Sequence, residues 1–463
     1  MNREFLLAAA WSLACCLIIG MGTGDFFRNE GLRSRVAWTM ARDGLTIVPR
    51  LDGELLATKP PLVYWLVAAP ARLLGDIPLA LARWPSVAAL VVVSAGLAVV
   101  VGRQHDRMAG LGAGLFFPMA IGWLSQVPSA ELDMPLTACV AGSWLGLAVA
   151  LDEKKTGRAN LWWVLAGAIA GIGFWTKWTA PVFFHAAVLG MAIVRRDPWI
   201  LIGTGHGLAI LAESVFGLAW LALASREVGF QALIDGVVHR EALPHLSPWH
   251  HRVGLRPVEW LSYPFQALGM GLPAIVGLFF LIRRNLRHDA GGATGFQVLL
   301  AGSLLSLAFW TLVPGHRPRH SLPAVAGLVA TGCWLGGLAL THAGNRVRPR
   351  RILFAACGLW LIVMLVFRNE RIQAAMAETA PAHVANRLAL ALPHQATLGV
   401  IGLRDDGLLL QLERNGFRVI RGKMLDGQAE YWLLTQTEAT EESSCVPGNW
   451  TDQQGAGIVL IRR

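Results

Sequence analysis

Residues 79–101 read LALARWPSVAALVVVSAGLAVVV, an apolar run with a single charged residue, Arg83, close to its start. An α-helix needs about 20 apolar residues to cross the hydrocarbon core of a bilayer, and this run is long enough. The next residues, GRQHDR at 102–107, form a short basic loop, which is typical of the cytoplasmic side. This stretch therefore predicts a membrane-spanning helix with Arg83 at its outer end.

The composition extends this prediction to most of the chain. Of the 463 residues, 54% are hydrophobic and 15% charged, whereas soluble domains carry about 25% charged residues. Mean hydropathy is +0.48, so a soluble fold is not expected. We count about eleven candidate spans, at 4–22, 79–101, 108–125, 133–151, 161–178, 180–194, 199–224, 260–282, 294–313, 320–341 and 351–367.

Basic loops set the expected orientation, because Lys and Arg are retained in the cytoplasm. With the N-terminus inside, every second loop is short and basic, at 103–107, 153–158, 195–196, 283–287 and 346–351. An odd number of spans then places the C-terminus outside. The first span could instead be a signal peptide, but its apolar run is long and no A-x-A-like site precedes Asp25, which favours an uncleaved anchor.

Hydropathy divides the chain into a membrane part, residues 1–370, and a small C-terminal part, residues 380–463. In the second part, strand-like and helix-like runs alternate. We expect strands at 397–401, 417–420, 431–435 and 458–461, and a helix at 405–415 that ends at Gly416. This pattern predicts a compact α/β domain outside the membrane.

Two long segments between spans, 24–78 and 225–259, fall on the outer side. In the first, apolar residues at helical spacing between Asn29, a good N-cap, and Gly44 predict an amphipathic helix lying along the membrane interface. A second such helix is expected from Pro60 to Gly75, because proline suits the first turn of a helix and glycine its end.

The first outer segment also carries polar motifs in a particular order, namely RNEGLR at 28–33, KPPLVYW at 59–65 and LARWP at 81–85. This order resembles the first periplasmic loop of GT-C membrane glycosyltransferases, in particular the lipid A aminoarabinose transferases and the protein O-mannosyltransferases. The resemblance implies a GT-C-like fold, a polyprenyl-phosphate-linked sugar donor, and a lipid, glycan or protein acceptor. It also implies a multi-pass protein of the bacterial inner membrane with a periplasmic C-terminal domain.

Those families place an essential Asp-Glu pair where this chain has Asn29 and Glu30. An amide cannot take a proton from an acceptor hydroxyl, so the base is expected to be Glu30 or the nearby Asp25. In the structural alternative, Asn29 is only an N-cap and Glu30 only a favourable charge in a first helical turn.

Two further carboxylates, Glu131 and Asp133, stand at the mouth of the fourth span, where the resembling families keep acidic residues. Converging carboxylates can abstract a proton or bind a divalent cation; alternatively, they are solvated charges at a span end. A divalent cation is the one cofactor to consider. However, Thr58 replaces the metal-binding carboxylate that the lipid A-modifying relatives carry before the lysine of the K-P motif.

Cationic and phenolic side chains on the outer side are expected to bind the phosphate of the donor and to stabilise it as it leaves. Lys177 follows FWT in an element that resembles L-T-K-G of the relatives, although Trp178 replaces the glycine. The alternative for each cation is snorkelling or pairing with a carboxylate. The expected set is Lys59, Tyr64, Arg83, Lys177, Arg317 and Arg319.

The second outer segment contains histidines, of which His239 and His250 are candidate metal ligands. Because their spacing matches no ligand pattern, solvent exposure is the alternative. Glu213 lies inside an apolar run, where a carboxylate needs a partner.

A lipid or sugar transporter is the competing class of function. It would need polar groups through the depth of several spans and usually repeated halves, whereas here ionisable residues gather at one face. A third class is an acyl- or phosphoethanolamine-type transferase. It would need a matched nucleophile and base, which the sequence does not show. For the C-terminal domain we expect a role in handling the acceptor, and no nucleic acid is expected as a partner.

Overall fold

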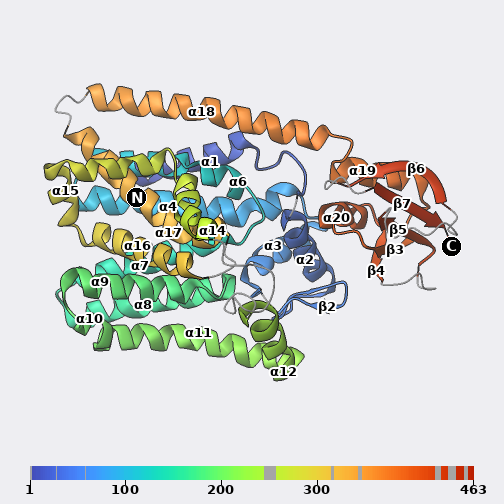
Figure 1. Ribbon diagram of the computed structural model, residues 1–463, viewed down its shortest axis with the longest axis horizontal. Coiled ribbons are helices and arrows are strands. Elements are labelled where there is room, and N and C mark those ends of the chain that lie inside the picture. The colour runs from blue at the N-terminus through green and yellow to red at the C-terminus, as the bar shows by residue number, and fades with distance from the viewer. Residues whose placement is uncertain are drawn as a thin grey trace.

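The computed structural model describes residues 3–27, 29–57, 59–243, 257–313, 317–342, 347–422, 429–435, 445–452 and 457–462. A body of helices makes up most of the molecule, and a small domain with a β-sheet lies at one end of it (Figure 1). The first outer segment lies between the body and this domain, so three parts of the chain meet at one end of the helices.

Seven helices in the described part of the chain are long and apolar enough to cross a membrane. They are α4 (Leu79–Gln104), α7 (Asp133–Asp152), α8 (Thr156–Thr176), α11 (Thr204–Val228), α16 (Thr294–Leu312), α17 (Leu322–Thr341) and α18 (Val347–Met376). The α14 (Pro257–Met270) and η3 (Ala274–Ile282) helices would form an eighth span, although they are bent by 109° at their junction. The chain is therefore a polytopic α-helical membrane protein.

The described residues do not form eleven continuous spans, because four of the expected ones are short, broken or bent. The α1 helix (Arg3–Ile19) has 17 residues and α9 (Ala180–Arg195) has 16. The third candidate is divided into α5 (Arg107–Phe116), η1 (Phe117–Met119) and α6 (Ile121–Gln126). Pro118 within the short η1 turn cannot donate a backbone hydrogen bond, which explains one break. The bent pair is the fourth.

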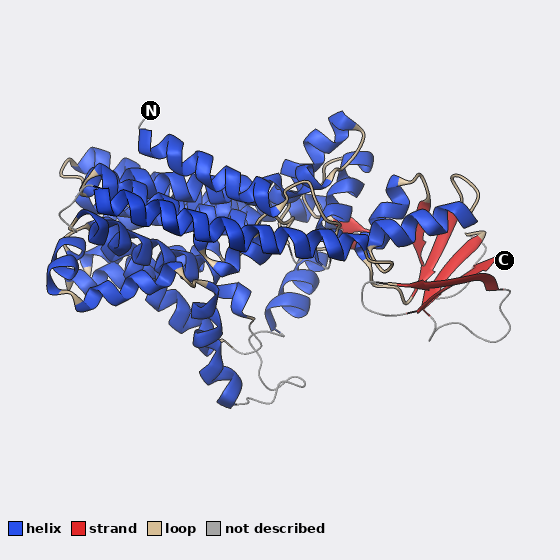
Figure 2. Ribbon diagram, turned by 90° about the horizontal axis from the view of Figure 1, so that it is seen from above, coloured by secondary structure: helices blue, strands red, loops and turns tan. Residues whose placement is uncertain are grey.

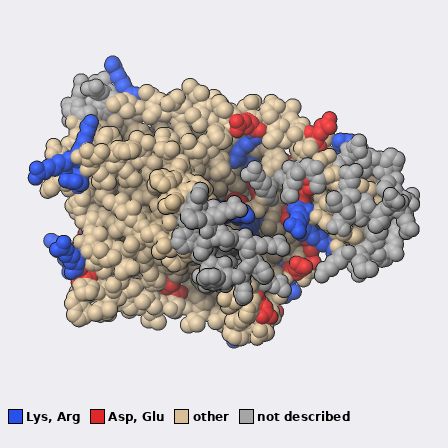
Figure 3. Space-filling model, in the orientation of Figure 1, with Lys and Arg blue, Asp and Glu red and all other residues tan. Residues whose placement is uncertain are grey.

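Shorter elements connect these helices. They are α10 (Trp199–Ile202), α12 (Phe230–Ile234), the π-helical η2 (Asp235–Ala242), α15 (Arg284–Gly291) and η4 (Pro318–Ser321). Large aromatic side chains fill the body between the helices, and Trp144 of α7 donates to the carbonyl of Phe183 on α9 at 3.0 Å. On the face shown in Figure 3, Lys, Arg, Asp and Glu gather towards the two ends and leave a mostly uncharged band between them, as a membrane requires.

The first outer segment folds into α2 (Asn29–Asp43), a short hairpin of β1 (Arg50–Leu51) and β2 (Glu54–Leu55), and α3 (Leu62–Leu74). Both helices lie where the sequence predicts them. Asn29, however, is the first residue of α2 and not the N-cap that precedes the helix. Gly75 ends α3 with a φ of 67°, a conformation that glycine adopts without strain.

The C-terminal domain is a five-stranded sheet with two helices (Figure 2). Its elements are α19 (Pro381–Ala391), β3 (Thr397–Ile401), α20 (Asp406–Arg414), β4 (Arg418–Arg421), β5 (Tyr431–Thr435), β6 (Cys445–Thr451) and β7 (Gly457–Arg462). The strand order is β4-β3-β5-β7-β6, in which β3 is parallel to both neighbours and the other pairs are antiparallel. Sequence alternation missed β6 and α19.

Candidate active site

Two groups of charged side chains lie at the end of the helical body that faces the C-terminal domain. The first is an ion pair between Glu30 of α2 and Arg83 of α4. Arg83 donates from Nε to one oxygen of Glu30 at 2.7 Å and from Nη2 to the other at 2.9 Å. The amide of Ala130 also donates to Glu30, at 3.0 Å. Glu30 is 7% exposed and Arg83 is 2% exposed, so this pair is closed to solvent.

The remaining donors of Arg83 are used by the turn that leads into α2. Its guanidinium donates to the carbonyl oxygens of Gly20 at 3.2 Å, Thr23 at 2.7 Å and Asp25 at 3.1 Å. A planar guanidinium has five N–H donors, and here each is directed at a protein oxygen. Glu30 and Arg83 therefore hold the first outer segment on α4.

Asp25 is likewise occupied, by the C-terminal domain. One carboxylate oxygen accepts from the Gln411 side chain at 2.7 Å, and the other accepts from the amide of Ala382 at 2.6 Å. Ala382 is in the first turn of α19, where backbone amides lack partners within the helix. The side chain of Asp25, which is 2% exposed, thus joins two distant parts of the chain.

The second group surrounds Glu131 and Asp133 at the start of α7, and we call it the outer carboxylate group. Lys177, which follows α8, donates from Nζ to Asp133 at 2.8 Å. Arg319 of η4 places Nη1 3.9 Å from a Glu131 oxygen, and Asn29 of α2 hydrogen-bonds to Glu131. Four parts of the chain therefore bring predicted site residues to one place.

Arg33 joins this group, although sequence analysis assigns it no role beyond its place in the RNEGLR motif. It donates from Nη1 to the hydroxyl of Tyr64 on α3 at 2.6 Å. Its buried Nε has no hydrogen-bond partner within the described structure. Arg33 is one helical turn beyond Asn29, so both face the same side. Burial alone would lower the pKa of Arg33, but Tyr64, Glu131 and Asp133 together raise it, so the guanidinium stays charged.

Glu131 differs from the first group in its protonation chemistry. Burial raises its pKa above the ordinary value, and the charge of Asp133 adds to this effect, while Arg33, Arg319 and Asn29 oppose it. Its side chain is 14% exposed. A partly accessible carboxylate with a raised pKa is a stronger base than an ordinary glutamate, so Glu131 can accept a proton from a hydroxyl.

The structure places the other predicted residues as follows. Lys59 is partly exposed just before α3, and Arg317 is exposed at the start of η4. His239 is exposed on η2, 4.0 Å from Asp235, and takes no part in the outer carboxylate group. His250 and Thr58 lie outside the described residues.

A metal site does not emerge from the residues that the structure describes. They contain no group of three or more His, Cys, Asp or Glu residues that could hold a metal ion. Within the outer carboxylate group, Lys177 and Arg319 supply the positive charge that a divalent cation would otherwise bring.

Two other polar clusters lie away from this group. Glu213 on α11 has a partner, His185 on α9, at 3.3 Å, and His185 in turn contacts His206 at 3.1 Å. This chain joins two helices and places a histidine beside a carboxylate inside the body.

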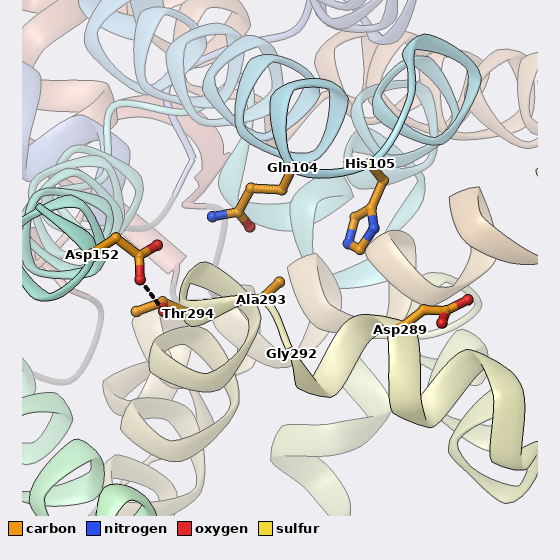
Figure 4. Close-up of a pocket in the computed structure, with 7 residues that line it drawn as sticks. All are labelled: Gln104, His105, Asp152, Asp289, Gly292, Ala293 and Thr294. Atoms are coloured by element: carbon orange, nitrogen blue, oxygen red, sulfur yellow. Dashed lines mark hydrogen bonds between the residues drawn. The ribbon is translucent and has the colours of Figure 1, made fainter.

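The second cluster is an open pocket at the far ends of α4 and α7 (Figure 4), lined by Gln104, His105, Asp152, Asp289, Gly292, Ala293 and Thr294. Asp133 and Asp152 begin and end α7, so the pocket is about 28 Å from the outer carboxylate group. Asp152 accepts from Thr294 and pairs with Arg195, and Asp289 pairs with His342. Its carboxylates are thus already compensated.

A family model matches part of the chain. Residues 58–220 match the model for dolichyl-phosphate-mannose-protein mannosyltransferases. The matched region contains the K-P-P-L-x-Y-W motif, the two carboxylates of the outer carboxylate group, and Lys177.

Curated relatives carry a related name. A Pseudomonas aeruginosa undecaprenyl phosphate-alpha-4-amino-4-deoxy-L-arabinose arabinosyl transferase is 28% identical over 356 residues, which are 74% of this chain and 61% of that protein. A Pectobacterium atrosepticum protein of the same name is 25% identical over 316 residues, 67% of this chain and 55% of that protein. The chain therefore matches less than two thirds of the length of these relatives.

The fold is shared along nearly the whole chain with a solved enzyme. ArnT from Cupriavidus metallidurans, bound to undecaprenyl phosphate, superposes with a TM-score of 0.75 at 14% identity and covers 98% of this chain and 97% of its own. Its apo structure gives the same values. The chain has the fold of a GT-C membrane glycosyltransferase. It resembles the aminoarabinose transferases and the mannosyltransferases, and the resemblance predicted from the first outer segment is confirmed.

Proposed function

We propose that this protein is a membrane glycosyltransferase that moves a sugar from a polyprenyl-phosphate-linked donor to an acceptor at the non-cytoplasmic face. The observation that carries the proposal is the outer carboxylate group, in which Glu131, with a raised pKa, lies among cations. Acceptor activation needs a base, and phosphate departure needs positive charge. Both requirements are met at one end of the helical body.

In the proposed reaction, Glu131 takes the proton of an acceptor hydroxyl. The acceptor oxygen forms a bond to the anomeric carbon as the bond from that carbon to the phosphate oxygen breaks. The electron pair of the broken bond leaves with the polyprenyl phosphate, and direct displacement inverts the anomeric centre. One proton moves to the carboxylate and one negative charge to the phosphate, so no further reactant is needed.

Cations around the base would receive the departing phosphate. Arg33 has a buried N–H without a partner among the described residues, and the hydroxyl of Tyr64, which accepts from Arg33, retains its own proton to donate. Burial raises the pKa of Tyr64, so it remains a neutral donor near pH 7. Lys177 and Arg319 already face the carboxylates. Lys59 and Arg317 are the remaining residues that the sequence predicts to bind the phosphate of the sugar donor.

The setting of the reaction follows from the class of relatives. The curated relatives are named for a sugar carried on undecaprenyl phosphate, which supports a donor of this kind and a lipid acceptor. We place the protein in the bacterial inner membrane with its N-terminus cytoplasmic and residues 380–463 in the periplasm as a separate domain. In this arrangement α2 and α3 lie along the outer membrane interface. The apolar helices that are too short or bent would complete about eleven passages through the bilayer.

Transfer in membranes tests the proposal directly. Vesicles containing the protein are incubated with radiolabelled sugar on synthetic undecaprenyl phosphate and with lipid A, and the labelled acceptor is measured. We expect transfer by the wild type and a loss of about 100-fold or more in Glu131→Gln. The transporter alternative finds no support among the relatives. It would gain support if the wild type made no labelled product but moved the donor across the bilayer.

A further inference from the structure

The α2 helix presents two opposite faces to two different parts of the molecule. Asn29 and Arg33 are one turn apart and face the outer carboxylate group. Gly31 and Arg35 are each two residues further along, about 200° around the helix, and face α20 of the C-terminal domain. A displacement of α2 by the domain would therefore move Asn29 and Arg33 relative to the outer carboxylate group.

Arg35 forms the centre of the contact with the domain. Its side chain is fully buried, and it donates to Glu413 of α20 at 2.9 and 3.0 Å, to Asp406 at 3.3 Å and to Asp52 after β1 at 2.5 and 2.8 Å. Arg421 of β4 lies 2.7 Å from Asp406 and 3.2 Å from Asp52. One guanidinium thus fixes the orientation of α2 relative to both the hairpin and the domain.

The backbones of the two helices also touch. A Cβ atom built on Gly31 would lie 2.3 Å from the amide nitrogen of Gly407, and one built on Gly407 would lie 2.0 Å from the carbonyl oxygen of Phe26. Neither position can hold a larger residue unless the helices separate. This close approach sets the distance between α20 and α2 as well as their orientation.

We propose that the C-terminal domain is a positioning element of the transfer site, acting through Arg35 and the contact between Gly31 and Gly407 to hold α2 against the outer carboxylate group. The inference rests on the proposed transferase function. It differs from a role in handling the acceptor, because the domain then acts on the geometry of residues that the reaction itself uses. Arg35 is a positioning residue and touches no substrate.

A second ion pair between the domain and the body provides a matched control. Arg414 of α20 donates to both oxygens of Asp76, at 2.8 Å each. Asp76 follows α3 and lies on the approach to α4, so this pair docks the domain without contacting α2. A variant at Arg414 therefore weakens docking in general and leaves the path through Arg35 intact.

The decisive comparison is between Arg35→Met and Arg414→Met in the full-length protein. For Arg35→Met we expect kcat to fall about 100-fold, as for a misplacement of about 1 Å, with a smaller change in the KM for lipid A. Arg414→Met should stay within about threefold of the wild type. Equal activities of the two variants would overturn the proposal. A rise in the acceptor KM with kcat unchanged would also overturn it and would assign the domain to acceptor binding.

The pH profile adds a readout that a loss of stability would not move. Glu131 is faced by Asn29 and Arg33 from α2, Tyr64 from α3, Asp133 from α7, and Arg319 from η4. The two α2 residues lower its pKa, so withdrawing α2 should raise it and move the acidic limb of the activity profile to higher pH. This movement should appear in Arg35→Met and be absent in Arg414→Met.

Gly407→Ala is the second variant, for the case that Arg35→Met does not fold. It removes no charge and adds one methyl group at the contact with Phe26. The folded fraction is measured by gel filtration in detergent, and we expect the same fall in kcat and the same movement of the acidic limb. A folded Gly407→Ala protein with wild-type kcat and pH profile would overturn the proposal. Absence of transfer by the wild type would instead contradict the proposed function.

Discussion

Two carboxylates at the same end of the helical body, Glu30 and Glu131, have opposite surroundings. Both oxygens of Glu30 are paired with one edge of Arg83, and one of them also accepts from a backbone amide. Glu131 has one arginine at 3.9 Å, a hydrogen bond from Asn29, and the repulsion of Asp133. The first carboxylate is satisfied, whereas the second has a raised pKa and is partly exposed.

The difference shows how a carboxylate that stabilises the fold can be told from one that can do chemistry. A buried charge with all its hydrogen bonds made lies in an energy minimum, and its removal leaves its partner unpaired. A carboxylate held near a second one, with incomplete pairing, is ready to accept a proton. Sequence motifs point to both residues, and only their hydrogen bonds and ion pairs distinguish one from the other.

The largest effect is expected on Glu131→Gln, which keeps the shape of the side chain and removes the base. We expect kcat/KM to fall about 10²- to 10⁴-fold, with the unfolding temperature unchanged or slightly higher. Sugar transfer and thermal unfolding in detergent are measured on the same preparation. If Glu131→Gln keeps more than about a tenth of wild-type activity, the contrast between the two carboxylates does not hold.

Arg83→Met tests the other carboxylate of the comparison, Glu30, by removing its cation. It leaves Glu30 buried without its cation, and we expect a loss of about 3–5 kcal/mol in the free energy of unfolding. Unfolding is followed by denaturant titration, and the double variant Arg83→Met, Glu30→Leu should regain part of the loss. An Arg83→Met protein of normal stability and no activity would place Arg83 in the site.

Lys177→Met tests the cation nearest to Asp133. The lost charge-assisted hydrogen bond should reduce kcat/KM for the donor about 10- to 100-fold. The matched control is Lys155→Met, since Lys155 lies at the other end of α8, next to its first residue. An equal effect of both substitutions would mean that Lys177 acts only through the net charge of the protein.

The smallest effect is a displacement of the pH profile in Arg319→Gln. Glu131 must be ionised to accept a proton, so activity is lost as the pH falls through its raised pKa. Arg319 lowers that pKa, and its removal should move the acidic limb to higher pH. The plateau rate at alkaline pH should change less than tenfold. An acidic limb that moves to lower pH would contradict the assignment of Glu131 as the base.

Local features of the fold could be predicted from the sequence because they depend on periodicity. The α2 and α3 helices, and β3, β4, β5 and β7, lie at or near the expected positions. The number of continuous spans could not be predicted, since hydropathy does not register a bend of 109° or a short helix. Strand β6 was missed because CVPGNW has little alternation.

The candidate site was predictable in its residues but not in its pairings. Lys177 and Asp133 were both expected on the outer side, and they form a salt bridge. Glu30 and Asp25 were expected as bases, but their partners are far away in sequence at Arg83 and Gln411. Arg33 could have been found from its spacing to Asn29. Nothing local in the sequence identifies the partners of Arg35.

The hydrogen bond from Ala382 to Asp25 has a consequence for biosynthesis, because it joins residues 357 positions apart in the sequence. A ribosome makes Asp25 early and Ala382 late, and in the proposed topology the intervening helices must enter the membrane between these events. The first outer segment therefore lacks its contact with the C-terminal domain until most of the chain has been made. We expect nascent chains that lack residues 381–413 to insert normally and to remain inactive.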